Sequence, residues 1–289
     1  MASSTPTAAL APGTAAAAFD KTSEIYERMT GGCTREVAKF LLTLEPKVDT
    51  SSVILDNACG TGIVTEEILN QFPETAKPSI FAADLAPSMV LNFAAKAKSR
   101  GWITDGQGSG NDALSVSVMD AENLTCPDET FTHSYTNLGF PFFSNAEKAA
   151  MHVYRTLRPG GTAFVSTWKT LGYMRPLHEA QRAVRPMDAL WEPPLAKDWY
   201  TQEKLISGLV AGGFDREKIQ IFTASVGYRG KDVGDLIDIM KMGFLGQVAS
   251  GWSEEEKDQW VRELPKALTE REKESATIDM IAWVAVVQK

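Results

Sequence analysis

The sequence is poor in cysteine and histidine, with three of each among its 289 residues. Cys33, Cys59 and Cys126 lie far apart and are odd in number, so they match neither a zinc site nor a disulfide framework. This usage is typical of a reducing compartment, and we therefore predict a cytoplasmic location. The sequence shows no Ser-His-Asp arrangement and no metal-ligand pattern. It therefore indicates neither catalysis by such a triad nor a bound metal.

Positive charge and long apolar runs are also scarce. The net charge of -8 gives no general attraction for phosphate backbones, so we expect no nucleic-acid partner. No apolar run approaches the roughly 20 residues that span a bilayer, so we expect no membrane partner. Residues 1–18 lack a basic start and a long apolar core, which predicts a flexible tail rather than a signal peptide. The remaining expectation is a small-molecule substrate, bound by a monomer or a homodimer.

Residues 53–67 form the stretch around which the rest of the chain is organised. Residues 53–55 are a short β-rich apolar run, typical of a buried parallel strand, and Asp56 closes it. Gly60 and Gly62 leave room for a ligand to touch the backbone and adopt positive φ without strain. The helix that follows directs its free N–H groups towards that ligand.

Two kinds of cofactor compete for this strand, turn and helix. A dinucleotide fingerprint requires a third glycine, and Thr65 stands at that position. The chain instead has the pattern D-x-x-x-G-x-G over residues 56–62, which resembles motif I of the class I S-adenosylmethionine-dependent methyltransferases. Its wording, D-N-A-C-G-T-G, is most similar to the small-molecule branch of that family.

Acids at the ends of the next two predicted strands test the two alternatives. Asp84 follows a strand at 80–83, where a carboxylate can accept hydrogen bonds from two ribose hydroxyls in either kind of enzyme. Asp120 follows a strand at 114–119 and resembles the acid that binds the adenine amino group in the methyltransferase family. A nicotinamide enzyme has no particular need for Asp120. The turn L-R-P-G-G at 157–161, before a buried strand, strengthens the resemblance.

The resemblance implies a doubly wound, Rossmann-like α/β fold. Its seven-stranded sheet has the order 3-2-1-4-5-7-6, with the last strand antiparallel. We expect one domain at 19–289, with a helical cover at 19–45 and helical insertions on the substrate side at 170–200 and 231–274. The resemblance is good over residues 50–170, weak over the last two strands, and absent from the insertions.

The implied cofactor is S-adenosyl-L-methionine. The predicted cofactor-binding residues come from the cover and from four strand ends: Tyr26; Asp56, Ala58, Cys59, Gly60 and Gly62; Asp84, Leu85 and Met89; Asp120 and Ala121; Asn137 and Leu138. By resemblance, Leu85 and Met89 enclose the adenine ring, and backbone carbonyls of Asn137 and Leu138 hold the methionine amino group. Tyr26 and Met89 are equally consistent with plain packing.

The insertions are rich in aromatic residues and methionine, which suits an apolar or aromatic acceptor. The predicted substrate-pocket residues are Phe140, Phe143, Trp168, Tyr173, Met240 and Phe244, although many such side chains could simply fill a helical core. Of the three histidines, His178 is the candidate general base, because it lies in the insertion after strand 5. A solvent-facing histidine beside Glu179 is the alternative.

The sequence therefore predicts methyl transfer to oxygen, sulfur or nitrogen of an apolar or aromatic small molecule. Motif I and the insertions resemble fungal secondary-metabolite methyltransferases, which implies a secondary metabolite as the acceptor. Transfer is an in-line displacement in which alignment supplies most of the catalysis. Alternatives are a cofactor-binding cyclase of the same fold, a non-catalytic regulatory partner, and a nicotinamide-dependent oxidoreductase. Thr65 and Asp120 disfavour the last of these.

Overall fold

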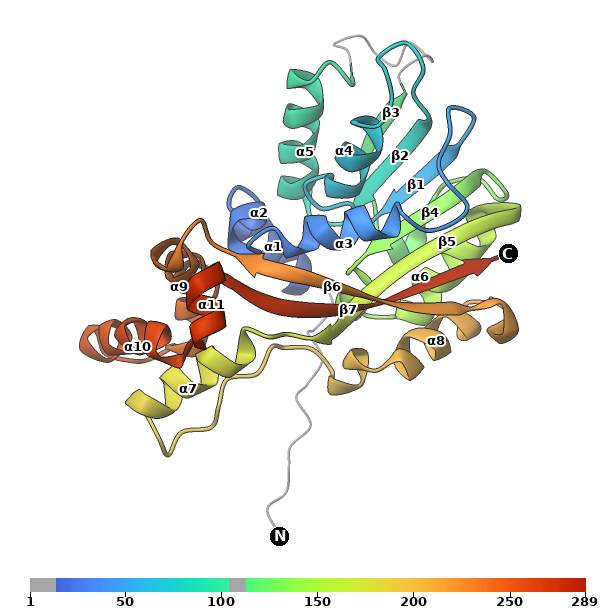
Figure 1. Ribbon diagram of the computed structural model, residues 1–289. Helices are drawn as coiled ribbons and strands as arrows, with labels where there is room; N and C mark the ends of the chain where they lie inside the picture. The colour runs from blue at the N-terminus through green and yellow to red at the C-terminus, as the bar shows by residue number, and fades with distance from the viewer. Residues whose placement is uncertain (1–13, 104–112) are drawn as a thin grey trace.

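A computed structural model describes residues 14–103 and 113–289 and contains a seven-stranded sheet with helices on both faces (Figure 1). The strand order is β3-β2-β1-β4-β5-β7-β6, with β7 antiparallel to both of its neighbours, as predicted. The strands are β1 (Val53–Asn57), β2 (Ser79–Asp84), β3 (Leu114–Val118), β4 (Phe131–Asn137), β5 (Leu157–Thr170), β6 (Gln220–Arg229) and β7 (Thr277–Gln288).

The centre of the sheet is parallel and buried. Strand β1 pairs in parallel with β2 and β4, and the side chains of Ile54 and Leu55 are fully buried on opposite faces. This explains why β1 reads as a continuous apolar run rather than an alternating one. Because β1 to β4 run in parallel, their carboxyl ends meet at one edge of the sheet, where doubly wound folds bind ligands.

Helices cover the two faces in two separate hydrophobic layers. One cluster packs α3 (Cys33–Leu41), α4 (Ile63–Leu69) and α5 (Pro87–Ser99) against the sheet. The other packs α6 (Ala146–Thr156) and α8 (Gln202–Ala211) on the opposite face. Short 3-10 turns complete this part: η1 (Ala121–Asn123), η2 (Phe140–Phe142), η3 (Lys197–Tyr200) and η4 (Arg216–Lys218).

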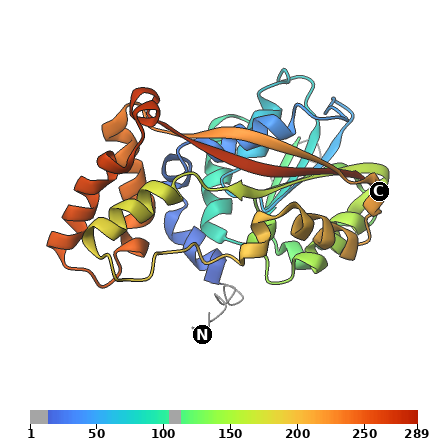
Figure 2. The same ribbon diagram turned by 60° about the horizontal axis from the view of Figure 1, so that its bottom comes forward.

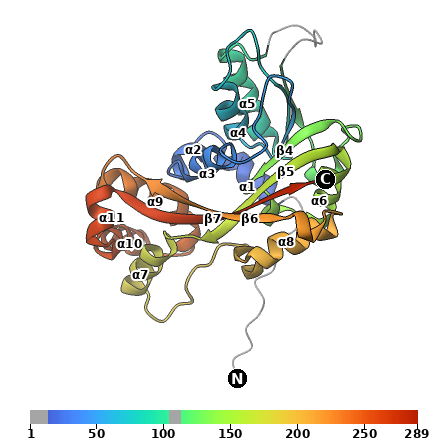
Figure 3. The same cartoon turned by 45° about the vertical axis from the view of Figure 1, so that its right-hand side comes forward.

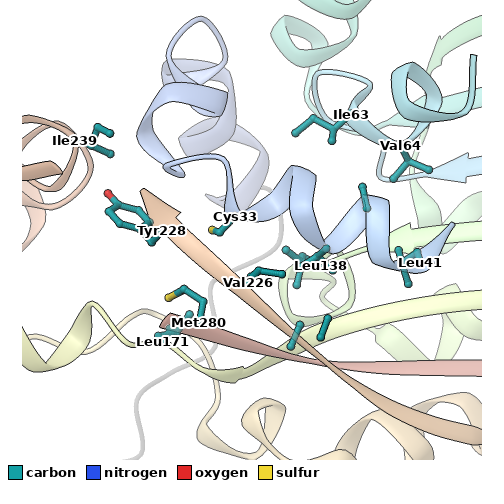
Figure 4. Close-up of a cluster of buried hydrophobic side chains, with 14 of the residues drawn as sticks. Cys33, Leu41, Ile63, Val64, Leu138, Leu171, Val226, Tyr228, Ile239 and Met280 are labelled. Atoms are coloured by element: carbon teal, nitrogen blue, oxygen red, sulfur yellow. The ribbon is translucent and has the colours of Figure 1, made fainter. Parts of the chain in front are cut away.

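The predicted insertions form a helical group at one end of β6 and β7 (Figures 2 and 3). It contains α7 (Met174–Val184), α9 (Val233–Val248), α10 (Glu254–Ala267) and α11 (Glu270–Ser275). A capping box of Ser253 and Glu256 opens α10, and Pro265 lies inside that helix. The buried cluster that contains Leu138 and Val226 continues to Ile239 of α9, so this group shares a core with the sheet (Figure 4).

The N-terminal cover is a pair of short helices, where the sequence suggested one helix at 19–30. Helix α1 (Thr14–Thr22) begins inside the segment predicted to be a tail, and α2 (Tyr26–Met29) follows after a turn. Residues 1–13 of that predicted tail lie outside the described residues. Gly31 and Gly32, which follow α2, both have positive φ.

The segment 157–161 is more regular than the predicted turn. Strand β5 already begins at Leu157, which pairs with Phe131, and the next pair joins His133 to Thr162. The intervening residues are therefore a bulge in the β4–β5 ladder. A Cβ at Gly161 would lie 2.8 Å from the carbonyl oxygen of Phe131, so this close backbone approach requires glycine.

Candidate active site

A cavity of about 310 Å³ lies at the carboxyl ends of the central strands, beneath α1 and α2. It brings together ten of the thirteen predicted cofactor residues: Tyr26, Ala58, Gly60, Asp84, Leu85, Met89, Asp120, Ala121, Asn137 and Leu138. These residues come from the cover and from the ends of four strands. The strand-end pattern in the sequence therefore identified one continuous site.

Asp84 lies at the end of β2 and faces the cavity with a carboxylate that is already partly bonded. Its Oδ2 accepts a hydrogen bond from the backbone N–H of Gly60 at 2.8 Å, and its Oδ1 accepts one from Ala86 at 2.8 Å. Burial raises the pKa of Asp84, and these two N–H groups oppose the rise. Each oxygen keeps a lone pair for a further donor, as two vicinal hydroxyls would provide.

The loop between β1 and α4 approaches the cavity with Ala58 and Gly60. Both have φ of 55°, and nothing lies within 4 Å of the place where a Cβ of Gly60 would stand. The backbone of Gly60 is therefore open to a ligand, as the sequence predicted.

Asp56, Cys59 and Gly62 do not line the cavity, which corrects three of the predicted contacts. Asp56 is buried below the loop, where its Oδ2 accepts hydrogen bonds from the Thr65 amide at 3.1 Å and the Thr65 hydroxyl at 2.6 Å. A Cβ on Gly62 would collide with the ring of Phe93. These residues therefore hold the loop in shape from the side away from the cavity. Motif I contains such supporting residues as well as residues that face the cavity.

The segment after β3 forms a second wall. Asp120 Oδ1 accepts a hydrogen bond from the Glu122 amide at 2.9 Å, which fixes the turn of η1. Glu122 Oε1 accepts one from the Asn145 amide at 2.9 Å, which joins this turn to the start of α6. Met119 and Glu122 line the cavity without having been predicted, because a single predicted acid marks only the end of the strand.

The exit of β4 is fixed by a small polar network. The Asn137 Nδ2 donates to the Thr34 carbonyl at 3.0 Å, and its Oδ1 accepts from the Ser166 hydroxyl at 2.8 Å. The same Ser166 oxygen accepts from the Leu138 amide at 2.9 Å, and Leu138 has φ of 62°. A leucine in the left-handed region is unusual, and strain of this kind gathers at ligand sites.

The cover closes the cavity with aromatic side chains. Phe19 of α1 packs edge-on against Phe142, with ring centroids 5.0 Å apart, and lies 6.0 Å from the ring of Tyr26. Asp20 Oδ1 accepts a hydrogen bond from the Ser88 amide at 2.8 Å, which holds α1 against α5. The other wall residues that the strand-end pattern missed are Ala16, Gly139 and Ser144. Their only sequence signal was their nearness to a strand end or to a helical cover.

Most predicted substrate-pocket residues lie elsewhere. Phe143 lines the cavity, whereas Phe140 is fully buried between Phe143 and Trp199. Trp168, Tyr173 and Phe244 are partly buried against the main core, and Met240 is fully buried in it. His178, the predicted base, is also outside the cavity, and its Nε2 donates to the Trp191 carbonyl at 2.7 Å.

The charge of the lining decides between the two cofactor classes. Among the cavity residues that the structure describes, Asp84, Asp120 and Glu122 are acidic and none is Lys or Arg. Such a lining suits a ligand that carries positive charge and provides no cationic side chain for the pyrophosphate of a dinucleotide. S-adenosylmethionine carries a sulfonium and an ammonium group, so the residues present fit that cofactor.

Known proteins agree with this fit. A family model described as a methyltransferase domain matches residues 54–161. The methyltransferase tpcH of Aspergillus fumigatus is 27% identical over 224 residues, which cover 75% of each chain. The chain is a class I S-adenosylmethionine-dependent methyltransferase. Its cofactor is S-adenosyl-L-methionine.

A further relative and a solved structure are similar to this chain. The acetylaranotin bis-thiomethyltransferase of Aspergillus terreus is 25% identical over 226 residues, covering 75% of this chain and 72% of that protein. The solved structure of the [4+2]-cyclase SpnF has a TM-score of 0.61 at 15% identity and covers 99% of each chain. The second likeness concerns the fold alone. Within the described parts of this methyltransferase, no helix is long and apolar enough to cross a membrane.

Proposed function

We propose that this methyltransferase transfers the methyl group of S-adenosylmethionine to oxygen, sulfur or nitrogen of an apolar or aromatic small molecule, a secondary metabolite. The observation that carries the proposal is the convergence of four strand ends and the cover on one acidic cavity. The similarity to tpcH and to a thiomethyltransferase supports an acceptor of this class, with sulfur among the candidate atoms.

The cavity residues have distinct parts in this proposal. When bound, the cofactor supplies an electrophilic methyl group on a sulfonium. Asp84 would accept the ribose hydroxyls, Asp120 the adenine amino group, and the carbonyls at Asn137 and Leu138 the methionine ammonium. Phe19 and Tyr26 would exclude water from above, which strengthens each of these interactions.

An aromatic cluster lies outside the cavity, in the core shared with the helical insertions. Tyr173 packs against Phe244, with ring centroids 4.6 Å apart, and against Tyr228 at 5.5 Å. Burial raises the pKa of Tyr173 well above its usual value, and neighbouring Cys33 and Tyr200 raise it further. Tyr173 therefore remains protonated at neutral pH and is not a base.

The protonation of Tyr173 bears on the mechanism, because a protonated phenol is not a general base. With His178 bonded to a carbonyl away from the cavity, the geometry does not support its predicted role as general base. A thiol or a phenol ionises readily and needs at most a weak base or water. We therefore expect catalysis by alignment of the acceptor at near-attack distance, which can lower a barrier by several kcal/mol.

Calorimetric titration with S-adenosylmethionine, S-adenosylhomocysteine and NAD tests the cofactor site. We expect micromolar binding of the two adenosyl ligands, no binding of NAD, and loss of at least about tenfold in affinity in Asp84→Ala, since a carboxylate hydrogen bond is worth roughly 1.5–3 kcal/mol. Asp238→Ala on the exposed face of α9 is the matched control. Unchanged affinity in Asp84→Ala would remove Asp84 from the site.

Release of S-adenosylhomocysteine in the presence of thiophenols and phenols tests the reaction. We expect methylated product in proportion to the released S-adenosylhomocysteine. Conversion of an acceptor without that release would favour the cyclase alternative instead. Tight cofactor binding with no conversion of any acceptor would favour a regulatory partner.

A further inference from the structure

We propose that Glu27 is a positioning residue for the cofactor, because it fastens the cover of the cavity to the loop that carries Gly60. The inference rests on the proposal that the cavity is the cofactor site, and it does not depend on the acceptor. Glu27 itself does not line the cavity. It acts through its neighbour in the chain, Tyr26, and through Thr61 of the loop.

Several hydrogen bonds meet at the carboxylate of Glu27, and we call this group of contacts the clasp. Glu27 Oε1 accepts a hydrogen bond from the Thr61 hydroxyl at 3.1 Å and another from Lys96 Nζ at 3.1 Å. Its Oε2 accepts from the guanidinium of Arg35. Thr61 lies between Gly60 and Gly62 and is buried, so its hydroxyl cannot readily exchange this partner for water.

The electrostatics favour a charged Glu27 in this position. Burial tends to raise its pKa, but the hydrogen bond from Arg35 and the charge of Lys96 outweigh burial and hold the pKa below its usual value. Glu27 is therefore ionised at neutral pH. A hydrogen bond to an ionised acceptor is shorter and stronger than one between neutral groups.

Other polar anchors of the cover end on different elements. The Asp20 and Ser23 side chains of the α1 region bond to Ser88 and Asn92 at the start and middle of α5. The end of α2 is held at the far side, where Tyr228 donates to the Met29 carbonyl at 3.0 Å. Among the described contacts of α1 and α2, the hydrogen bond from Thr61 to Glu27 joins the cover to the glycine loop.

Removal of Glu27 leaves no cation without a partner. Arg35 also bonds to Glu66 at 2.8 Å and to Glu67 at 2.6 Å, and Lys96 also bonds to Glu66 at 2.9 Å. Loss of Glu27 therefore exposes no unpaired buried charge, which is the usual cause of severe destabilisation. Its contribution to cofactor binding can thus be separated from its contribution to folding.

The test compares cofactor affinity and stability in Glu27→Met. We expect the dissociation constants for S-adenosylmethionine and S-adenosylhomocysteine to rise about tenfold, which is about 1.4 kcal/mol. Most of the change should appear as faster release of S-adenosylhomocysteine, because the cover opens more often. The thermal midpoint of the free protein should stay within about 3 °C of the wild type.

Two variants and one control make the result specific. Glu27→Gln keeps a carbonyl acceptor for Thr61 and should recover part of the affinity. Thr61→Val should weaken binding as Glu27→Met does, and the double variant should be little weaker than either single variant, because both remove one contact. Glu24→Gln, on the exposed side of the same segment, should bind like the wild type.

The outcomes distinguish this inference from the site assignment. Wild-type affinity in Glu27→Met, with binding lost in Asp84→Ala, would overturn the clasp and leave the site intact. Additive effects of Glu27→Met and Thr61→Val would also overturn it. Unchanged binding in both Asp84→Ala and Glu27→Met would overturn the site itself.

Discussion

Two glycines in the same loop meet opposite surroundings. Gly60 has φ of 55° and open space at its missing Cβ, on the cavity side. Gly62 has φ of 80°, and a Cβ there would lie 2.2 Å from the Phe93 ring. The second glycine is therefore required by the packing of α5 on the loop, whereas the first leaves its backbone open to the cavity.

This difference predicts a separation of binding from stability. Gly62→Ala should lower the free energy of unfolding by more than about 2 kcal/mol, because left-handed strain adds to overpacking. Gly60→Ala should lower it by only about 1–2 kcal/mol, through strain alone, and should weaken S-adenosylhomocysteine binding markedly. Urea unfolding and calorimetry on both variants measure the two effects. Equal loss of stability would contradict the packing argument.

At the residue scale, the sequence identified acids and amides where strands end, because parallel strands bring their carboxyl ends together. Asp84, Asp120 and Asn137 all lie on the cavity for this reason. Phe19 was not predicted, since its place depends on how α1 folds back over the sheet. Asp56 was predicted to contact the cofactor, but it supports the loop instead. The spacing of a motif does not distinguish residues that support a loop from residues that face a ligand.

At the element scale, regular strands and helices were predictable from apolar runs, capping residues and glycine stops. Asn145, for example, is a residue type that favours helix starts, and it caps α6 by accepting a hydrogen bond from the Lys148 amide at 2.9 Å. Two features were not predictable. The break between α1 and α2 and the bulge at the start of β5 depend on contacts with distant segments, which local propensity does not contain.

The cap of α6 predicts an effect on the cavity as well as on the helix. Asn145→Ala should lower the free energy of unfolding by about 1 kcal/mol. It should also weaken cofactor binding, because Asn145 follows Ser144 on the cavity wall and its amide bonds to Glu122. Ser253→Ala removes the corresponding cap of α10, far along the chain, and is the matched control.

The two cap variants are compared at equal loss of stability. Chemical unfolding should give similar losses for Asn145→Ala and Ser253→Ala, whereas titration with S-adenosylhomocysteine should show weaker binding in Asn145→Ala alone. If the two variants bind S-adenosylhomocysteine with equal affinity, the loop after β4 holds its shape without the cap.

At the scale of the whole molecule, the insertions were predicted to be helical and to lie on the substrate side, with aromatic and methionine side chains in the substrate pocket. Tyr173, Met240 and Phe244 belong to a core shared by β6, α7 and α9, and none of them lines the cavity. Composition shows that such residues will be buried, but not whether a ligand or another helix buries them. Only the packing of the helical group against β6 and β7 decides this.

Acid stability offers a test of the central sheet. His133 of β4 packs against the stacked rings of Tyr135 and Phe164, with centroids 6.3 and 6.0 Å away. Its Nδ1 lies 2.7 Å from the Thr132 hydroxyl, and its Nε2 is buried without a hydrogen-bond partner among the described residues. Burial lowers the pKa of His133, assisted by Arg158 and opposed by the Pro46 carbonyl and Asp49.

The sign of the pH effect follows from this lowered pKa. The unfolded chain binds a proton at His133 near pH 6.5, whereas the folded chain does so only at lower pH. The contribution of neutral His133 to stability is therefore complete above about pH 6.5 and falls as the pH decreases through the folded pKa. The slope cannot exceed about 1.4 kcal/mol per pH unit for one proton.

His133→Phe should remove this acid-side loss. Phenylalanine keeps the ring stack, and Thr132 stays bonded to the Val53 backbone, where it accepts from the amide and donates to the carbonyl, both at 3.0 Å. Asp56 titrates in a similar range, since burial raises its pKa to about 6, but its effect is common to both proteins and cancels in their difference.

Urea unfolding between pH 5 and 8 measures the effect. The free energy of unfolding of His133→Phe should rise relative to that of the wild type as the pH falls below 6.5. A constant difference over that range would mean that His133 accepts its proton equally well in the folded and unfolded chains, and that the sheet centre tolerates the charge.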